Sequence, residues 1–411
     1  MSEFLANIKK RYRRTRKRLL GKAKRILKDL TLWHIFPARY RHLCKRPVEA
    51  GHAICLEGKE TEMSDSFALV YERLKADPSK TVAFVSTNQN HVRYLIYCRN
   101  CWNALEEITR AEVVFLEDAS DLVSCLPLRP ETRIVQLWHA CGAFKKWGMS
   151  CTEKKFGDDR ASIERHPFYK NLSLVTVSSP EVRWAYAEAM DLERTPEIIQ
   201  PLGVSRTDVF FDEAFLAGAR AKVEEAFPEA AGRKIILYAP TFRGHVKGAK
   251  GPDALDIEAM CAALGDEYKL IIKHHPFVKH PPRIPAGCEG FAHLVRGDLT
   301  IDELLCAADV CITDYSSIVF EWSLFERPIL FFAYDRDDYD DWRGFYYPYE
   351  EFTPGPVVTT TEQVIDCIEG LGEGFDPSEV HAFKERFMCA CDGHATDRIL
   401  AAAFPEDGSE E

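Results

Sequence analysis

The stretch LLCAADVCITDYSSIVFEWSLFERPILFFAYD, residues 304–335, decides the fold of this chain. Its first apolar run, Ala308 to Thr313, is typical of a buried strand in a parallel sheet, and a second run, Pro328 to Ala333, has the same character. Between the two runs, a polar turn leads into a helical pattern that starts at Ile318. The stretch therefore predicts a strand, a turn, a helix and a strand, and ligands of open α/β sheets bind where strands end and helices begin.

The polar turn itself has the composition of a phosphate site. Ser316 and Ser317 supply hydroxyl groups at a predicted helix N-terminus, where unpaired N–H groups and a partial positive charge favour anions. Asp314 precedes them, as a ligand-binding acid or as an acid that only stabilises the turn. Glu321 follows seven residues after Asp314, where it either accepts hydrogen bonds from ribose hydroxyls or is an ordinary surface glutamate.

The same alternation of strands and helices extends outward from this unit. Further strand-like runs lie at residues 81–87, 112–116, 134–138, 174–178, 234–239 and 269–273, and helical patterns lie at residues 91–109 and 213–228. Strands that alternate with helices indicate parallel sheets with right-handed crossovers. A fresh series begins at Lys234, so we expect two doubly wound α/β domains, residues 47–212 and 213–375, followed by closing helices and an acidic tail over residues 376–411.

The first 46 residues differ from the rest in charge. They hold 16 Lys and Arg against two acids, a balance of +14 in a chain whose net charge is −11. Apolar residues recur at helical spacing over residues 4–33, and Trp33 and Phe36 follow as aromatic residues of the kind that favour a membrane interface. We therefore predict a basic amphipathic helix on an anionic membrane surface, with a solvated basic arm or an RNA-binding tail as the alternative.

Other patterns exclude several classes of protein. No run of 18 uncharged apolar residues and no signal-peptide core is present, so the sequence predicts no membrane span. The 14 cysteines are scattered through apolar stretches, and the one CxxC pair, Cys98 and Cys101, has no second pair to complete a zinc site. With no P-loop and no GxGxxG motif, ATP and NAD sites are disfavoured, and we predict no metal and no cofactor.

A second candidate site follows the strand at residues 134–138. His139 comes directly after it, where an imidazole can act as a general base near neutral pH, although a lone histidine is more often structural. Lys145 and Lys146 follow and are expected to meet an anionic substrate or a lipid phosphate.

Three further residues suit the recognition of phosphate. Arg243 follows the strand at 234–239, His275 follows the strand at 269–273, and Arg343 lies in a loop rich in aromatic residues. A diphosphate needs several fixed donors, and a histidine, arginines, the paired serines and a helix end supply such a set.

Taken together, these clusters resemble the CDP-glycerol glycerophosphotransferase family, the teichoic acid primases and polymerases. The resemblance covers roughly residues 130–370 and consists of WHACGAFKKWG, PLGVSRTD, YAPTFRG, IIKHHPF, ADVCITDYSSIVFEW, RPILFFAYDRDDYDDWRGFYYPY and TPGP, in that order. It implies a GT-B-like fold of two Rossmann-like domains that face each other across a cleft. It also implies transfer of a polyol phosphate from a CDP-polyol to a hydroxyl of a lipid-linked or polymeric acceptor, on the cytoplasmic side of the cell membrane.

The resemblance suggests roles for individual residues. His139 looks like the family's acceptor-side histidine and candidate base, and His275 looks like the histidine of its His-Pro motif, which contacts donor phosphate. Ser316 and Ser317 match its donor-phosphate hydroxyls. The remaining matches have less specific roles: Arg243 and Arg343 at donor phosphate, and Asp314 and Glu321 at the nucleotide and ribose.

One departure concerns the presumed acceptor side. Many members read Trp-His-Gly followed by Thr-Pro, whereas this chain reads Trp138-His139-Ala140-Cys141-Gly142. We therefore expect CDP-glycerol as the donor, with CDP-ribitol as the first alternative. Two further functions stay open, a CMP-sugar glycosyltransferase of sialyl type and a non-catalytic membrane-bound scaffold of the same fold.

Overall fold

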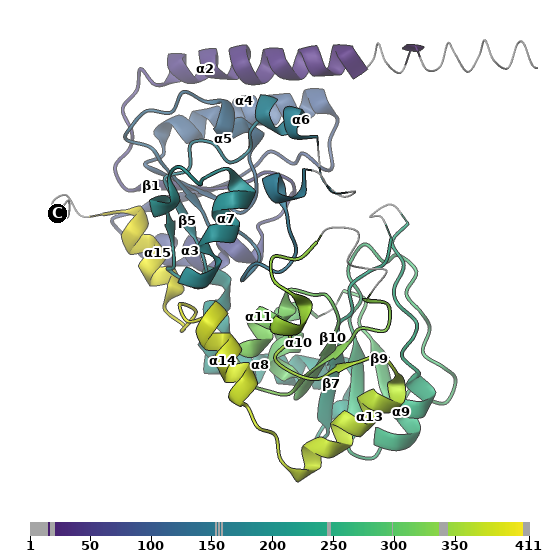
Figure 1. The fold of residues 1–411 in the computed structure, drawn as a ribbon. Helices are drawn as coiled ribbons and strands as arrows, with labels where there is room; N and C mark the ends of the chain where they lie inside the picture. Colours follow the sequence, from purple (N-terminus) through teal and green to yellow (C-terminus); the bar gives the residue numbers. More distant parts are fainter. Residues whose placement is uncertain are drawn as a thin grey trace, which may run out of the picture. The chain divides into compact units, whose positions relative to one another are not determined.

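Two six-stranded sheets form the centre of the fold in the computed structural model (Figure 1). The model describes residues 15–16, 21–152, 154, 157, 159–244, 248–297, 299–336 and 344–405. The first sheet has the order β2-β1-β3-β4-β5-β6, and the second has the order β12-β11-β10-β7-β8-β9. Strand order departs from chain order in both sheets, as it does in doubly wound α/β folds.

The strands of the first sheet are short and mostly buried. They are β1 (His52–Glu57), β2 (Thr81–Ser86), β3 (Val113–Leu116), β4 (Arg133–Gln136), β5 (Leu174–Thr176) and β6 (Ile199–Gln200). β1 pairs in parallel with β2 and β3, and β3 pairs in parallel with β4. The predicted strands near residues 81, 112, 134 and 174 are confirmed, whereas β1 and β6 had no predicted counterpart.

The second sheet contains the stretch that decides the fold. Its strands are β7 (Lys234–Tyr238), β8 (Tyr268–Ile272), β9 (Ala292–Leu294), β10 (Val310–Thr313), β11 (Ile329–Phe332) and β12 (Val357–Val358). β10 pairs in parallel with both β7 and β11, and β7 pairs in parallel with β8. Residues 304–335 form the predicted strand, turn, helix and strand, as β10, α11 (Ile318–Ser323) and β11.

Helices connect the strands. The remaining α-helices are α2 (Phe36–Leu43), α3 (Asp65–Ala76), α4 (Tyr94–Arg110), α5 (Asp121–Cys125), α6 (Arg160–Arg165), α7 (Arg183–Met190), α8 (Glu213–Ala226), α9 (Ile257–Leu264), α10 (Ile301–Ala307), α13 (Thr361–Gly370), α14 (Ser378–Phe387) and α15 (Ala395–Ala403). A π-helix, η1 (Thr31–Ile35), precedes α2. Short 3₁₀ turns are η2 (Gly148–Cys151), η3 (Pro180–Val182), η4 (Pro196–Ile198), η5 (Ser205–Phe211), η6 (Pro228–Ala230), η7 (Tyr349–Glu351) and η8 (Leu371–Glu373).

Side-chain caps fix where several of these helices start. The Thr300 hydroxyl accepts from the Glu303 N–H, and the Glu303 carboxylate accepts from the Thr300 N–H, a capping box that begins α10. The Asp212 carboxylate accepts from two N–H groups at the start of α8. These caps satisfy backbone donors that the first helical turn leaves without partners.

The described chain forms two compact units, each built from separate segments. Unit 1 comprises residues 1–137, 161–174 and 403–411, and unit 2 comprises residues 138–160 and 175–402. Because this division does not follow a single cut in the sequence, the predicted domain boundaries at 47, 213 and 376 stay a prediction.

The segment formed by η1 and α2 is part of the core of unit 1. Residues 21–30 are helical, and α2 packs against α4 (Figure 1). Leu32, Phe36 and Tyr40 are at most 3% exposed within the hydrophobic cluster that also contains residues of α4. The expectation that Phe36 anchors the chain in a membrane interface is therefore wrong, and η1 and α2 already fold into unit 1 ahead of the predicted boundary at residue 47.

The exposed part of this N-terminal helix lies before that buried segment. Residues 21–26 are exposed, and Ile26 and Leu30 keep 65% and 46% of their surface accessible. The rest of the predicted amphipathic stretch, residues 4–14 and 17–20, lies outside the described residues. Within the described part of the chain, no helix combines the length and the apolar character that a membrane span requires.

Candidate functional site

Unit 2 contains a cavity of about 670 Å³ that receives half of the predicted site residues. Four separate segments and Ile301 line it, and the lining includes His139, Lys145, Thr241, His275, Ser316 and Ser317. The structure thus brings the predicted histidines and the paired serines to one cavity. Their chemical roles remain predictions.

The topology of the second sheet explains why these segments meet. β8, β7 and β10 are neighbours in the sheet and run parallel, so their carboxyl ends lie at the same edge. Thr241 follows β7, His275 follows β8, and Ser316 and Ser317 follow β10. The cavity therefore occupies the position where open α/β sheets bind their ligands.

His275 has a defined tautomer when it is neutral. Its Nδ1 accepts a hydrogen bond from the backbone N–H of Phe277 at 3.2 Å. A nitrogen that accepts cannot carry the proton, so Nε2 is the protonated nitrogen of the neutral ring. The rings of Phe242 and Phe277 lie 5.0 and 4.5 Å from the imidazole centroid and hold its plane. The neutral side chain, which lines the cavity, thus carries an Nε2–H donor of the kind that suits a phosphate oxygen.

The neighbouring His274, which was not a predicted site residue, also lines the cavity. Burial lowers the pKa of His274, which favours the neutral imidazole. Only the composition KHHPF could have indicated that both histidines reach the cavity.

The loop that carries His139 is sharply bent. Trp138 has a left-handed backbone with φ of 62°, and Gly142 has φ of 59°. A left-handed non-glycine residue costs about 1–2 kcal/mol, so the surroundings must hold this loop. At Gly142, an added Cβ would lie 2.1 Å from the ring of Phe320, which leaves no space for a larger residue. The bend exposes the His139 side chain at the cavity.

Three side chains hold the backbone of this loop. The Tyr186 hydroxyl donates to the Gly142 carbonyl at 3.1 Å, and the Ser178 hydroxyl accepts from the Gly142 N–H at 3.1 Å. The Arg206 Nε–H donates to the His139 carbonyl at 3.2 Å. None of these three residues was predicted, although Arg206 stands in the quoted motif PLGVSRTD.

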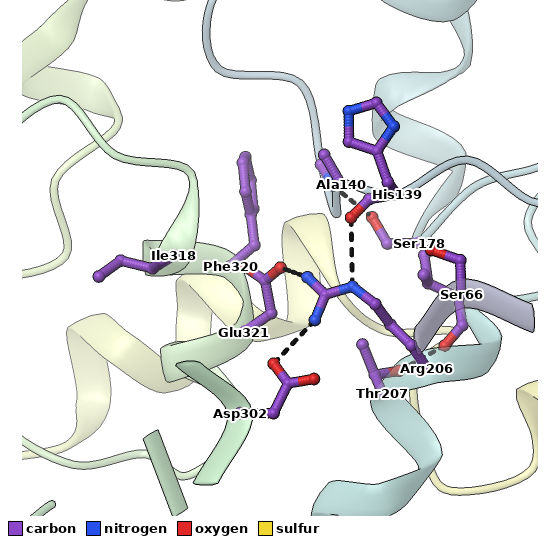
Figure 2. A network of polar contacts seen from close by, with 12 residues as sticks. Ser66, His139, Ala140, Ser178, Arg206, Thr207, Asp302, Ile318, Phe320 and Glu321 are labelled. Carbon is purple, nitrogen blue, oxygen red and sulfur yellow. Dashed lines mark hydrogen bonds and ion pairs between the residues drawn. The ribbon is translucent and has the colours of Figure 1, made fainter. Parts of the chain in front are cut away.

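Figure 2 shows the second role of Arg206. One Nη donates to the Asp302 carboxylate at 3.0 Å, and the other pairs with the Glu321 carboxylate. The Arg206 side chain is only 13% exposed, and the two acids are 9% and 4% exposed. The imidazole of His139 points away from the guanidinium, while its carbonyl faces it (Figure 2).

The predicted ribose contact of Glu321 is therefore corrected. The Glu321 carboxylate is buried and pairs with the Arg206 guanidinium. It therefore binds a side chain instead of a ribose. Burial raises the pKa of Glu321, and the charge of Arg206 opposes that shift.

The predicted ligand contacts of Asp314 and Arg243 are corrected as well. Asp314 is 1% exposed, and its Oδ1 accepts from the backbone N–H of Thr241 at 2.8 Å. Its Oδ2 lies 2.9 Å from Nη1 of Arg243, whose Nε and Nη2 pair with Asp335. Two carboxylates thus bind the Arg243 guanidinium, and Arg243 is not among the residues that line the cavity. Both residues support the loop that carries Thr241.

The two predicted lysines differ in position. Lys145 lines the cavity and pairs through its backbone with Phe345. Lys146 donates its backbone N–H to the Gly344 carbonyl at 3.1 Å, and its ammonium lies 5.7 Å from the ring centroid of Tyr346. The motif around His139 thus pairs with the motif around residues 344–346, whereas Arg343 lies outside the described residues.

Comparison with known proteins places these features in one family. The model of the family CDP-Glycerol:Poly(glycerophosphate) glycerophosphotransferase matches residues 38–404. A teichoic acid ribitol-phosphate primase of Bacillus spizizenii is 33% identical over 381 residues, which cover 89% of this chain and 94% of that protein. A teichoic acid glycerol-phosphate primase of the same species is 29% identical over 328 residues, which cover 80% of this chain and 81% of that protein.

A solved structure supports the fold. The wall teichoic acid polymerase TagF superposes with a TM-score of 0.73 at 22% identity, over 95% of this chain and 96% of that chain. With its two parallel-sheet α/β domains, the chain has the predicted GT-B-like fold.

Proposed function

The chain belongs to the CDP-glycerol:poly(glycerophosphate) glycerophosphotransferase family, and from that premise we propose that it transfers a polyol phosphate from a CDP-polyol to a hydroxyl of a lipid-linked or polymeric acceptor. The observation that carries the proposal is the single cavity lined by His139, His275, Ser316 and Ser317. It combines a candidate base with three donors for a diphosphate, as a phosphoryl transfer requires.

The proposed reaction is an in-line displacement at phosphorus. The acceptor oxygen forms a bond to the β-phosphorus of the CDP-polyol, and the bond from that phosphorus to the bridging oxygen breaks. CMP leaves with the bridging oxygen, and the acceptor proton moves to the imidazole of His139. The N–H of His275 and the hydroxyls of Ser316 and Ser317 stabilise the negative charge on the diphosphate.

The nature of the polyol is the finer part of the proposal. The family description names glycerophosphate, and CDP-glycerol is the donor expected from the sequence. The ribitol-phosphate primase matches more of the chain at higher identity than the glycerol-phosphate primase does. This difference favours CDP-ribitol as a second candidate donor.

A panel of donors tests the function. Release of CMP is measured from CDP-glycerol, CDP-ribitol and CMP-sialic acid, with and without a lipid-linked polyol-phosphate acceptor. We expect acceptor-dependent release from one of the CDP-polyols. Release from CMP-sialic acid alone would instead indicate a sugar transferase, and release from none would indicate a scaffold.

His275 tests the donor side of the site. Replacing His275 by alanine removes a hydrogen bond to a charged group, so we expect the affinity for the CDP-polyol to fall about tenfold or more. Isothermal calorimetry measures the change, with His280→Ala as the matched control, because His280 is exposed on the same loop and does not line the cavity. An unchanged affinity in His275→Ala would refute the phosphate contact.

The membrane location is also part of the proposal. We propose that the enzyme lies on the cytoplasmic leaflet through the part of residues 4–33 that precedes the buried Leu32. The exposed Ile26 and Leu30 and the exposed cations Lys22 and Lys24 support this contact. Sedimentation with anionic vesicles, compared with neutral vesicles, tests this contact. Equal amounts of protein in both pellets would count against it.

A further inference from the structure

Three side chains bind the backbone of the His139 loop, residues 138–142. Residues 138–142 include two left-handed positions, and their carbonyls and one N–H are bound by Arg206, Tyr186 and Ser178. Ser178 in turn donates to the Phe387 carbonyl at 2.7 Å, which ties the loop to the end of α14. One of the three side chains that bind the loop also forms ion pairs with α10 and α11, and α11 directly follows Ser316 and Ser317.

That side chain is Arg206. Its guanidinium is a rigid plane with donors in fixed directions, so its three partners are fixed relative to one another. They are the carbonyl of His139, the carboxylate of Asp302 at the start of α10, and the carboxylate of Glu321 in α11. α11 begins at Ile318, directly after the serine pair that lines the cavity. One buried cation thus links the loop of the candidate base to the helix that follows the donor hydroxyls.

We propose that Arg206 is a positioning residue that sets the placement of the His139 imidazole relative to Ser316 and Ser317. The inference rests on the proposed function, in which these groups act on one substrate. A displacement of about 1 Å in such a set costs roughly 100-fold in rate, so the contact affects turnover more than donor affinity.

A purely structural role would have a different requirement. Arg206 neutralises two buried acids, and removal of one partner from a buried ionic cluster strongly destabilises the fold because it leaves an uncompensated charge. If Arg206 only neutralised these acids, a lysine, which keeps the positive charge, would be a reasonable substitute. A lysine cannot reproduce the planar fork that serves Asp302, Glu321 and the His139 carbonyl together.

Two variants separate the roles. Arg206→Lys keeps the positive charge and removes the planar guanidinium with its fixed donor directions. The triple variant Arg206→Met, Asp302→Asn, Glu321→Gln removes the cation together with both acids, so no buried charge remains unpaired, and circular dichroism checks that it folds. In both variants we expect kcat for CMP release to fall about 100-fold, with the calorimetric affinity for the CDP-polyol within about threefold of wild type.

The matched control is Arg220→Lys. Arg220 also donates to backbone carbonyls and to an acid in unit 2, but it does not line the cavity or contact the His139 loop. Its replacement should leave kcat within about twofold of wild type. If Arg206→Lys or the folded triple variant also keeps kcat within about twofold, the positioning role is refuted.

A second readout does not depend on turnover. NMR spectra of histidine-labelled protein measure the imidazole carbon resonances, which report the conformation of the His139 loop directly. The His139 resonance is assigned by its loss in His139→Ala. We expect the His139 resonance to shift and broaden in both Arg206 variants and to stay unchanged in Arg220→Lys. An unchanged His139 resonance in the Arg206 variants would overturn the inference. Absence of CMP release in wild type with every donor would overturn only the proposed function.

Discussion

Replacing His139 by alanine is expected to lower kcat about 10²–10⁴-fold while leaving the affinity for the CDP-polyol nearly unchanged. The reason is that His139 is proposed to take the acceptor proton, a step that affects turnover, whereas the donor diphosphate is bound by His275 and the serines. Both quantities are measured on one preparation, CMP release by chromatography and donor binding by calorimetry.

A matched variant controls for the loss of a histidine as such. His394 is an exposed histidine of unit 2 that does not line the cavity, so His394→Ala should retain wild-type turnover. If His139→Ala retains more than about one tenth of wild-type kcat, the assignment of the base is wrong. A large loss of donor affinity would move His139 to the donor side of the site.

Arg243→Ala is expected to destabilise the fold by about 3–5 kcal/mol, because it leaves the buried carboxylate of Asp314 without its cation. Asp335 loses its paired guanidinium in the same variant. Urea unfolding followed by circular dichroism measures the change in the free energy of unfolding. Arg243→Lys retains the positive charge and should recover part of the loss.

An exposed ion pair gives the comparison for this effect. Arg336 pairs with Glu350 at the surface, with side chains 40% and 63% exposed, so Arg336→Ala should change stability by less than about 1 kcal/mol. If Arg243→Ala were as mild as Arg336→Ala and instead abolished donor binding, the predicted phosphate contact would be restored.

The sequence predicted those features that depend on local pattern. Apolar runs located β7, β8, β10 and β11 to within about two residues, because strands buried on both faces read as continuous hydrophobic segments. The rule that ligands bind at the carboxyl ends of parallel strands then placed His275 and the serine pair at one cavity. Both predictions needed only residues that are close together in the sequence.

The predictions that were wrong concerned pairs that are far apart in the sequence. Arg243 and Asp335 are separated by 92 residues, and Arg206 and Glu321 by 115 residues. An acid after a strand looks the same in sequence whether it faces a ligand or a buried arginine, so Asp314 and Glu321 were assigned to a nucleotide. In the same way, the amphipathic pattern near Phe36 did not reveal that its apolar face packs against α4.

The separate segments of unit 1 have a consequence for how the chain is made. In the sequence, residues 138–160 separate the first 137 residues from residues 161–174, and residues from Ala403 onward follow the last segment of unit 2. The ammonium of Lys80 lies 4.1 Å from the ring centroid of Phe404, so this contact within unit 1 forms only after the segments of unit 2 have been synthesised. Unit 1 is therefore incomplete until unit 2 has been synthesised, and its exposed apolar surface invites chaperone binding at that stage. For the same reason, no single cut in the sequence separates the two units.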